Sequence, residues 1–270
     1  MVEITRIAMF PMKNNVTQTW HSAGNTNTGL VRSSNQDAFV VDDTLGLWLV
    51  ADGMGGRAGG DVASRVAVKS IHDHFQPYSH AGLPVVSELN SADISAHLLS
   101  AIRDADLAIH AAARTQPELD GLGTTVVAIV VTCLSPLQIA IAHVGDSRAY
   151  LFRDGELRVL THDHTLVEDL LARGQIGPAE AASHPQRHIL LRALGIEGQM
   201  EPDISSEPVQ SGDVLLLCTD GITKMLGNEQ ITALLRSALH SPDNACKVLI
   251  AEANILGGKD NSTAVVVRFL

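Results

Sequence analysis

Aspartates beside glycines recur along this chain, each where an apolar run ends or begins. The segments are Arg32-Ser33-Ser34-Asn35-Gln36-Asp37, Ala51-Asp52-Gly53-Met54-Gly55-Gly56, His143-Val144-Gly145-Asp146-Ser147-Arg148, Cys218-Thr219-Asp220-Gly221 and Gly258-Lys259-Asp260-Asn261-Ser262. Carboxylates at strand ends can converge without being neighbours in sequence, and converging carboxylates repel one another unless cations neutralise them. Ligand sets made only of oxygen select hard cations such as Mg²⁺ and Mn²⁺. The pattern therefore predicts a divalent-cation site.

The simpler interpretation of an Asp-Gly pair is an ordinary turn, and we expect Asp154-Gly155 to be one. The pairs at Asp52 and Asp220 have a different context. Each follows a hydrophobic run that would deliver the carboxylate to the end of a strand, Leu45–Ala51 in one case and Val214–Cys218 in the other. The glycine that follows lets the backbone turn sharply and approach a ligand closely.

The elements that must position these residues alternate between strand clusters and helices. Strands are predicted over Ala38–Val41, Leu45–Ala51, Thr125–Cys133, Gln138–His143, Arg148–Arg153, Val214–Cys218 and Thr263–Phe269. Apolar residues at helical spacing predict helices over 62–74, over 94–109 after an N-cap at Ser91, from Asn228 to Ala238, and from Ser241-Pro242 to a stop at Gly257-Gly258.

Several of the strands are joined by short turns, such as Leu134-Ser135-Pro136. Strands joined as hairpins cannot form a parallel βαβ array, because each parallel pair needs a crossover. We therefore predict an α+β fold in which two antiparallel sheets pack face to face with helix pairs outside. No linker or repeat divides the chain, so residues 1–270 are expected to form a single domain, with a core from about residue 19 and an N-terminal extension over 1–18.

The composition of the chain limits the classes of partner that it is expected to bind and the cellular compartment in which it is expected to work. The 270 residues carry a formal net charge of −11, which disfavours binding to nucleic acid or to an anionic membrane. The longest apolar run, Val126 to Val131, is too short to span a bilayer, and the N-terminus does not resemble a signal peptide. Cys133, Cys218 and Cys246 are odd in number and form no CxxC, which is typical of a reducing compartment. We expect a cytoplasmic monomer.

Eight ordered motifs carry a resemblance to a known family. They are Val31–Asp37, Val50–Gly56, Gly123-Thr124-Thr125, Val144–Arg148, Leu160-Thr161-His162-Asp163-His164, Leu191–Gly195, Thr219-Asp220-Gly221 and Lys259–Thr263. In this order they resemble the metal-dependent protein phosphatases, the type 2C serine/threonine phosphatases. The resemblance runs from about Thr19 to Leu270, and Ala-Asp-Gly-Met-Gly-Gly is similar to the bacterial branch. It implies the same two-sheet sandwich and the binding of Mn²⁺ or Mg²⁺.

The resemblance also implies a role for each metal-site residue. Asp52 would bridge two metals, and the backbone carbonyl of Gly53 would bind one of them. Asp220 and Asp260 would complete the other metal position. Asp146, together with Asp220, resembles the ligands of a third, weaker metal. A hydroxide that bridges the two tightly bound cations would attack phosphoserine or phosphothreonine in line.

Further residues are assigned around the metals by the same resemblance. Asp37 and Asn261 would orient metal-bound water. Arg32 would grip the substrate phosphate with its planar guanidinium. Relatives often have a glutamate where this chain has Gln36, so one carboxylate is missing and an amide oxygen would act through water. The polar stretch over 165–187 is similar to the family's flap segment, with a plain surface helix as the alternative.

One departure from the family leaves the proton donor open. Eukaryotic relatives often carry a histidine directly after the Asp-Gly pair, proposed as the general acid, whereas this chain has Met54. Metal-bound water is the first candidate to protonate the leaving serine oxygen, and His143 is the second. Two other histidine pairs, His72 with His74 and His162 with His164, have H-x-H spacing, but no third zinc ligand is evident in the sequence.

Two rival functions are kept beside the phosphatase. One is an enzyme that hydrolyses a small phosphorylated metabolite or nucleotide. The other is a phosphoprotein-binding module without activity, which the presence of Asp52, Asp220 and Asp260 disfavours. The partners expected for the phosphatase are phosphorylated Ser/Thr proteins, including a cognate Ser/Thr kinase and its substrates.

Overall fold

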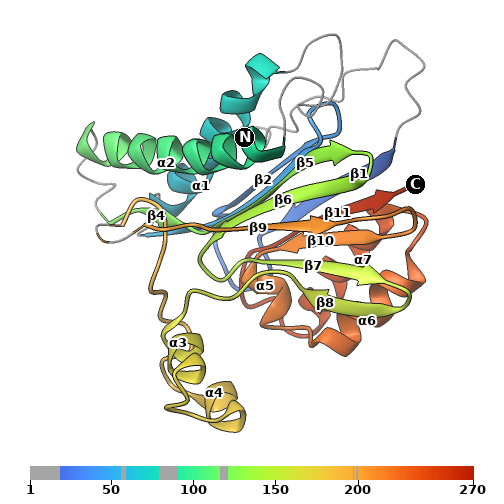
Figure 1. The fold of residues 1–270 in the computed structure, drawn as a ribbon. Coiled ribbons are helices and arrows are strands. Elements are labelled where there is room, and N and C mark those ends of the chain that lie inside the picture. The colour runs from blue at the N-terminus through green and yellow to red at the C-terminus, as the bar shows by residue number, and fades with distance from the viewer. Residues whose placement is uncertain (1–18, 56–58, 79–90, 116–120, 197, 199) are drawn as a thin grey trace.

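The computed structural model describes residues 19–55, 59–78, 91–115, 121–196, 198 and 200–270. The N-terminal extension predicted over 1–18 lies outside these residues. Within them the predicted α+β class is confirmed, because two antiparallel sheets pack against each other with helices outside (Figure 1).

The first sheet consists of β2 (Asp37–Asp42), β3 (Leu47–Met54), β5 (Val126–Leu134), β6 (Leu137–Val144) and β9 (Asp203–Pro208), in that order, and β4 (Gly123–Thr124) pairs with the end of β3. Its outer face is covered by α1 (Gly59–Phe75) and α2 (Ser91–Thr115), and η1 (Gln76–Tyr78) is a short 3₁₀ turn after α1. Buried aliphatic side chains such as Leu49, Ile71 and Ile102 fill the space between this sheet and the helix pair.

The second sheet has the order β1 (Trp20–Asn27), β11 (Ser262–Phe269), β10 (Val214–Cys218), β7 (Arg148–Arg153) and β8 (Glu156–Val159). On its outer face lie α6 (Asn228–Ser237) and α7 (Pro242–Ile255). The short α5 (Asp220–Thr223) follows β10 directly. The remaining helices, α3 (Leu166–Ala172) and α4 (Pro178–Ser183), form an arm that projects away from the sandwich (Figure 1).

The inner faces of the two sheets form a separate core of mostly aliphatic side chains. Its aromatic members Trp20, Trp48 and Phe269 meet edge to face, with ring centroids 5.7 to 6.4 Å apart. Edge-to-face contact is the favoured geometry for aromatic pairs. The three rings lie where β1 and β3 begin and β11 ends, and the candidate site lies at the opposite ends of these strands.

Local signals in the sequence predicted several boundaries correctly. Ser241 caps α7 by accepting a hydrogen bond from the Asn244 N–H at 3.2 Å. Beyond the end of α7, Gly257 has φ 131°, which a side chain would disfavour. Asp154 and Gly155 form the turn between β7 and β8, with positive φ at both.

Other boundaries differ from the prediction. The strand predicted over Leu45–Ala51 is Leu47–Met54, because Gly46 turns the chain at φ 65° and β4 extends the pairing as far as Met54. The helix predicted to follow Ser91 includes it. Strands β1, β4, β8 and β9 were not predicted. β9 is polar and mostly exposed, so it lacks the apolar pattern on which strand prediction depends, and it pairs only with the edge of β6.

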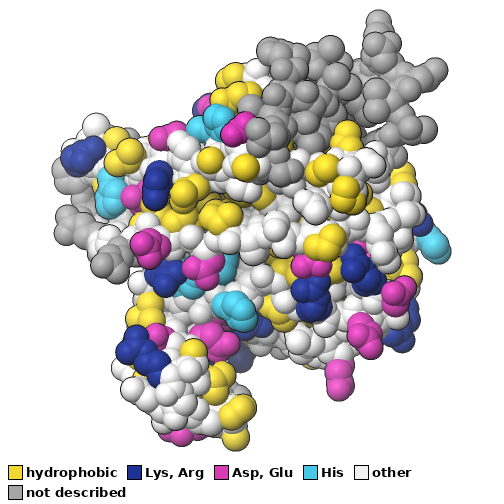
Figure 2. Space-filling model, viewed as in Figure 1, with side chains coloured by type: hydrophobic (Ala, Val, Ile, Leu, Met, Phe, Trp, Pro, Cys, Tyr) yellow, Lys and Arg dark blue, Asp and Glu magenta, His cyan; other side chains and the backbone are white. Residues whose placement is uncertain are grey.

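No helix among the described residues is long and apolar enough to cross a membrane. Charged side chains of both signs are interspersed over the face drawn in Figure 2, and no basic patch dominates it. A single-sign basic surface is the usual electrostatic footprint of nucleic-acid binding. Cys218 and Cys246 are buried, and all three cysteines are free.

Candidate metal centre and active site

The predicted acidic residues come together at one end of the sandwich, and both sheets contribute. In the first sheet, Asp37 at the start of β2 lies opposite Asp52 near the end of β3, and Asp146 follows the end of β6. In the second sheet, Asp220 follows β10 and Asp260 precedes β11, and these two strands are paired. Antiparallel pairing thus aligns the acidic residues within each sheet, and the packing of the two sheets brings both groups to the same end of the sandwich.

Four of these carboxylates, those of Asp52, Asp146, Asp220 and Asp260, line a cleft with two adjoining parts, of about 260 and 850 Å³, whereas Asp37 is buried behind it. The smaller part is lined by Asp52, Gly53, Met54, Gln36 and Asn261, among others. Shared by both parts are Arg32, Asp146, Asp220, Lys224, Asp260 and His188. The larger part reaches Ala181 of α4 and Arg187 beyond the end of that helix, so the segment over 165–187 that resembles the flap contributes to the cleft.

Mutual repulsion makes these carboxylates hard to ionise together. Burial, followed by the charges of Asp37 and Asp220, raises the pKa of Asp52 well above its ordinary value. Burial and Asp220 raise the pKa of Asp146 to about 7. The pKa of Asp37 is also raised to about 7, chiefly by burial.

The orphaned oxygens in this cluster indicate what it is built to bind. Asp220 Oδ1 and Asp37 Oδ1 are buried and accept no hydrogen bond among the described residues. An ionised carboxylate oxygen without a partner is costly to bury. An oxygen-only donor set, raised pKa values and unpartnered oxygens together fit divalent cations such as Mn²⁺ or Mg²⁺.

A pH dependence of stability follows for the protein freed of metal. In the unfolded chain the aspartates ionise near pH 4, but folded Asp37 and Asp146 keep their protons up to about 7. The folded state therefore binds more protons between these values, and stability falls as pH rises through that window. We expect the melting temperature in EDTA to drop by on the order of 5 °C from about pH 5 to about pH 8.

Saturating Mn²⁺ should remove this drop, because bound cations stabilise the ionised carboxylates. Asp146→Asn should reduce it, since one of the two titrating groups is gone. A melting temperature in EDTA that stays level or rises over the same pH range would contradict the raised pKa values.

Asp37 and Asn261 are held firmly by neighbouring groups. Asp37 Oδ2 accepts hydrogen bonds from the hydroxyls of Thr219 and Thr263, at 2.8 and 2.7 Å. The Asn261 amide accepts from the Gln36 N–H at 2.8 Å and donates to the backbone carbonyls of Thr28 and Ser34, each at 2.9 Å. The Asn261 side chain thus anchors the segment that carries Arg32, a contact that the sequence did not suggest.

Gly53 allows two backbone segments to approach closely. A Cβ added to it would lie 1.9 Å from the Gly60 carbonyl oxygen at the start of α1. The Gly53 N–H donates to the Gln36 carbonyl at 3.1 Å. The contact from Gln36 Nε2 to the Gly55 carbonyl is long, at 3.5 Å.

Arg32 lies at the rim of the cleft and pairs with a predicted metal ligand. Its Nε and Nη2 each lie 2.9 Å from an oxygen of Asp260, and the Arg32 side chain is 54% exposed. The guanidinium therefore binds Asp260 through two nitrogens, and its exposed part still lines the cleft. This geometry places it where a phosphate bound next to Asp260 would meet it.

His143, the second candidate for the proton donor after metal-bound water, does not fit this role, and Met54 at the position of the eukaryotic histidine cannot fill it. Met54 lines the smaller part of the cleft but carries no acidic proton. His143 is absent from the residues that line either part, within the described chain. Its Nε2 lies 2.6 Å from the His162 carbonyl, and burial lowers its pKa. His143 is therefore a poor candidate.

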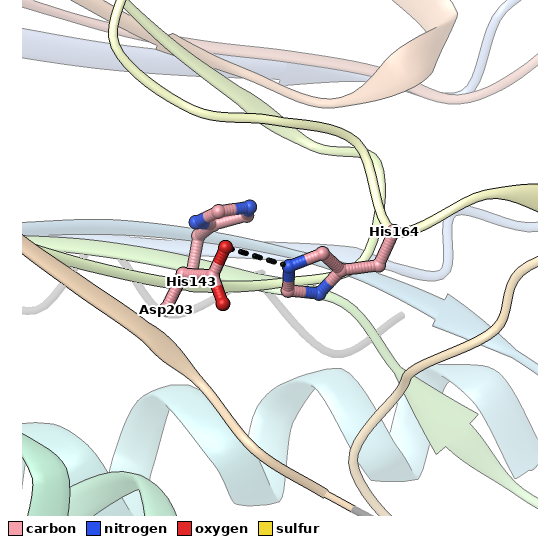
Figure 3. Close-up of side chains that lie close together, drawn as sticks. All are labelled: His143, His164 and Asp203. Carbon is pink, nitrogen blue, oxygen red and sulfur yellow. Dashed lines mark ion pairs between the residues drawn. The ribbon is translucent and has the colours of Figure 1, made fainter. Parts of the chain in front are cut away.

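His143 instead forms a cluster with His164 and Asp203, whose candidate ligand atoms lie within 4.8 Å of one another (Figure 3). The Gly145 N–H donates to His164 Nδ1 at 3.2 Å, so the His164 proton is on Nε2, which lies 3.2 Å from Asp203. Both nitrogens of His164 are thus engaged. The two rings lie 4.4 Å apart at 30°, so their in-plane lone pairs do not converge on one point.

We therefore interpret the cluster as a hydrogen-bonded support and not as a zinc site. Arg192 lies 3.0 Å from Asp203 and adds a positive charge there. His162, the other half of its H-x-H pair, is exposed. His72 pairs with Asp42 at 2.9 Å, whereas His74 contacts His97, so that pair separates as well. The His164 backbone also donates to the Gly145 carbonyl at 2.9 Å, which ties the support to the loop of Asp146.

With this geometry in view, comparison with known proteins is decisive. The sequence profile described as Protein phosphatase 2C matches residues 31–249. The chain belongs to the protein phosphatase 2C family. It is thus a metal-dependent protein serine/threonine phosphatase of the bacterial type, and its cofactor is Mn²⁺ or Mg²⁺.

Individual relatives agree with this assignment. The chain is 38% identical over 251 residues to the serine/threonine phosphatase stp of Listeria monocytogenes, covering 92% of this chain and 95% of the relative. A crystal structure of the Mycobacterium tuberculosis phosphatase PstP/Ppp superimposes with a TM-score of 0.81 at 35% identity, covering 93% of this chain and 98% of that one. The catalytic domain of PstP in complex with 2 manganese ions has a TM-score of 0.79 at 33% identity and the same coverage.

Two features of this protein phosphatase 2C site escaped the sequence analysis. Lys224 reaches the carboxylate of Asp220, and its spacing of four residues from Asp220 is a signal that could have revealed it. The second feature is Arg148, which binds Asp163 through two hydrogen bonds of 2.8 and 2.7 Å at the wall of the cleft. That pair joins residues 15 apart across a hairpin, and no local pattern indicates it.

Proposed function

We propose that Asp52, Asp220 and Asp260 hold two divalent cations at this cleft, that Asp52 lies between them, and that the Gly53 carbonyl completes one site. The observation that carries the proposal is the convergence of carboxylates from both sheets around a buried, unpartnered oxygen of Asp220. When bound, such cations neutralise phosphoryl oxygens and acidify water for attack on phosphorus. The segments that carry the ligands are held in place by hydrogen bonds of Gln36, Asp37 and Asn261.

The chain's own residues orient the substrate phosphate. Arg32 is partly exposed and lines the cleft, and because its Nε and Nη2 contact Asp260, the Nη1–Nη2 edge of the guanidinium is the one that we expect to meet a phosphate. A planar fork can bind two phosphate oxygens at once, which fixes the direction of the ester bond. Lys224 is a second cation beside the same carboxylates. Together they would hold a phosphate dianion against the acidic floor.

Substitution of Arg32 by lysine should distinguish the contribution of bidentate hydrogen bonding from that of the positive charge. Arg32→Lys keeps one positive charge but loses bidentate binding, so we expect KM for a phosphopeptide to rise on the order of tenfold, with a smaller fall in kcat. Steady-state kinetics with both variants measures this. Arg65→Lys is the matched control, because Arg65 pairs with Asp61 on the surface of α1, away from the cleft. Unchanged kinetics in Arg32→Lys would remove Arg32 from the phosphate site.

The substrate class that we propose is phosphoserine and phosphothreonine in proteins. The larger part of the cleft is open and extends to the arm, so a phosphate on a protein surface can enter. The wall of this larger part carries charges of both signs, from Glu168, Asp163 and Arg187. An open cleft with such a wall suits a polypeptide better than a small metabolite, which an enclosed pocket would bind.

A substrate panel tests this proposal. Purified protein with Mn²⁺ should hydrolyse phosphoserine and phosphothreonine peptides with a kcat/KM on the order of 10² or more above that for sugar phosphates and nucleotides, because contacts outside the phosphate add transition-state binding. Preference for one metabolite would favour the rival enzyme. Binding of phosphopeptides without turnover would favour the inactive binding module.

We further infer a cytoplasmic monomer of one domain whose partners include a Ser/Thr kinase and the substrates of that kinase. The support is the acidic net charge of −11, the free cysteines and the dependence of any phosphoprotein phosphatase on a kinase that supplies its substrate. The relatives' names refer to phosphatases acting on serine and threonine, and we extend that substrate class to this chain.

A further inference from the structure

Lys224 lies at the acidic floor of the cleft because of the backbone that carries it. α5 begins at Asp220, and the Lys224 N–H donates to the Asp220 carbonyl at 2.8 Å, one helical turn later. Residues four apart on a helix lie side by side. The Lys224 ammonium accordingly forms an ion pair with Asp220 Oδ2 and lies 3.6 Å from Asp260 Oδ2.

The two oxygens of Asp220 are therefore in different situations. Oδ1 is buried with no hydrogen-bond partner among the described residues, which leaves it available to a divalent cation. Oδ2 is in contact with the ammonium. If Asp220 served two metals, the second would approach the oxygen that Lys224 already covers. A divalent cation and an ammonium at one oxygen repel each other strongly in a partly buried site.

Asp146 is the other ligand that the resemblance gives to a third metal. It lines both parts of the cleft beside Asp220 and Lys224. The charge of Lys224 acts on Asp146 in the direction that favours its ionised form, opposing the effects of burial and Asp220. Lys224 thus neutralises the same two carboxylates that would bind the third cation.

Charge balance in the cleft agrees with this interpretation. Asp52, Asp146, Asp220 and Asp260 all line its smaller part, and two divalent cations would match their four negative charges. Lys224 adds a further positive charge beside Asp220 and Asp146, and Arg32 adds one beside Asp260. A third divalent cation would exceed what the carboxylates can neutralise.

We propose that Lys224 is a built-in cation that takes the place of a third divalent metal beside Asp146 and Asp220, so that this chain binds two metal ions. The proposal rests on the metal site proposed above. It assigns Lys224 to positioning and charge neutralisation in the cleft, and the protein would need less free metal to complete its site.

Counting bound Mn²⁺ tests it. Metal-free wild type, Lys224→Met and Lys247→Met are each dialysed against increasing Mn²⁺, and bound metal is measured by elemental analysis and calorimetry. Lys247→Met is the matched control, because Lys247 forms the same i,i+4 pair with Asp243 on exposed α7. We expect about two ions in wild type and in the control, as for the related PstP domain, and about three in Lys224→Met, the last being the weakest.

A second measurement does not depend on metal. In EDTA, Lys224→Met should melt below wild type, because it leaves the carboxylates without a counter-charge, and Mn²⁺ should restore most of the difference. Lys224→Gln serves if the methionine variant does not fold. Three ions in wild type, or two in both Lys224 variants, would overturn the proposal and leave the metal site standing. No Mn²⁺ bound to wild type would instead refute the metal site itself.

Discussion

Replacing any one of Asp52, Asp220 and Asp260 by asparagine should abolish nearly all phosphatase turnover. Each change removes a charged oxygen from the cluster that lines the smaller part of the cleft. Bound metal supplies several kcal/mol of transition-state charge stabilisation, and each 1.36 kcal/mol is a factor of ten in rate. We therefore expect kcat to fall on the order of 10³-fold or more, measured on a phosphopeptide at saturating Mn²⁺.

The fold should survive these substitutions, since asparagine is nearly isosteric and relieves repulsion among the carboxylates. Circular dichroism and thermal melting in EDTA check this. Asp243→Asn is the control, because Asp243 is an exposed aspartate on α7 that pairs with Lys247 and does not line the cleft, and this variant should retain full activity. Ligands that act as one unit lose activity in a non-additive way. A double variant many times slower than each single one would argue against a shared site.

Chelation is the second change with a large expected effect. Protein treated with EDTA should lose hydrolysis of p-nitrophenyl phosphate to the background rate, because the proposed attack on phosphorus depends on water that bound cations acidify. Cys218 and Cys246 are buried and burial raises the pKa of both thiols to about 12, so neither is available as a thiolate.

Addition of Mn²⁺ or Mg²⁺ in excess of the chelator should restore activity, whereas Ca²⁺ should restore little, since it favours more ligands and longer bonds. The assay is a metal titration of the initial rate. Inactivation that persists after re-addition would point to unfolding, which thermal melting distinguishes. Full activity in EDTA would be incompatible with catalysis by the carboxylate cluster.

Much of the fold was predictable because its elements carry local signals. The apolar runs that form β3, β5, β6, β10 and β11 are nearly continuous, since both faces of those strands are buried. The Ser241-Pro242 start of α7 depends on capping chemistry within one turn. By contrast, β9 is exposed and polar, and its pairing partner β6 lies some 60 residues earlier in the chain.

The candidate site was predictable in its membership but not in its contacts. Asp52 and Asp220 each stand where an apolar run ends, beside a glycine, and this local pattern predicts the candidate carboxylates, the type of metal that suits them and the family. The two residues belong to different sheets, so their convergence depends on how the sheets pack. What lies between the carboxylates depends on side chains from different sheets. Only the tertiary structure decided that Arg32 pairs with Asp260, that Asn261 anchors the segment of Arg32, and that His143 joins His164 and Asp203.

Lys224 shows the difference between what the sequence and what the tertiary structure reveal about the site. Its spacing from Asp220 is local and visible in the sequence, and helical geometry alone brings the two side chains together. The role of Lys224 as a counter-charge depends also on Asp146 and Asp260. These two residues lie next to β6 and β11, far from Lys224 or in another sheet. Local spacing is governed by backbone geometry over a few residues, whereas the charge environment of a group is the sum over everything that folding places nearby. The sequence therefore predicts the candidate ligands, and the tertiary structure decides which charged groups lie beside them.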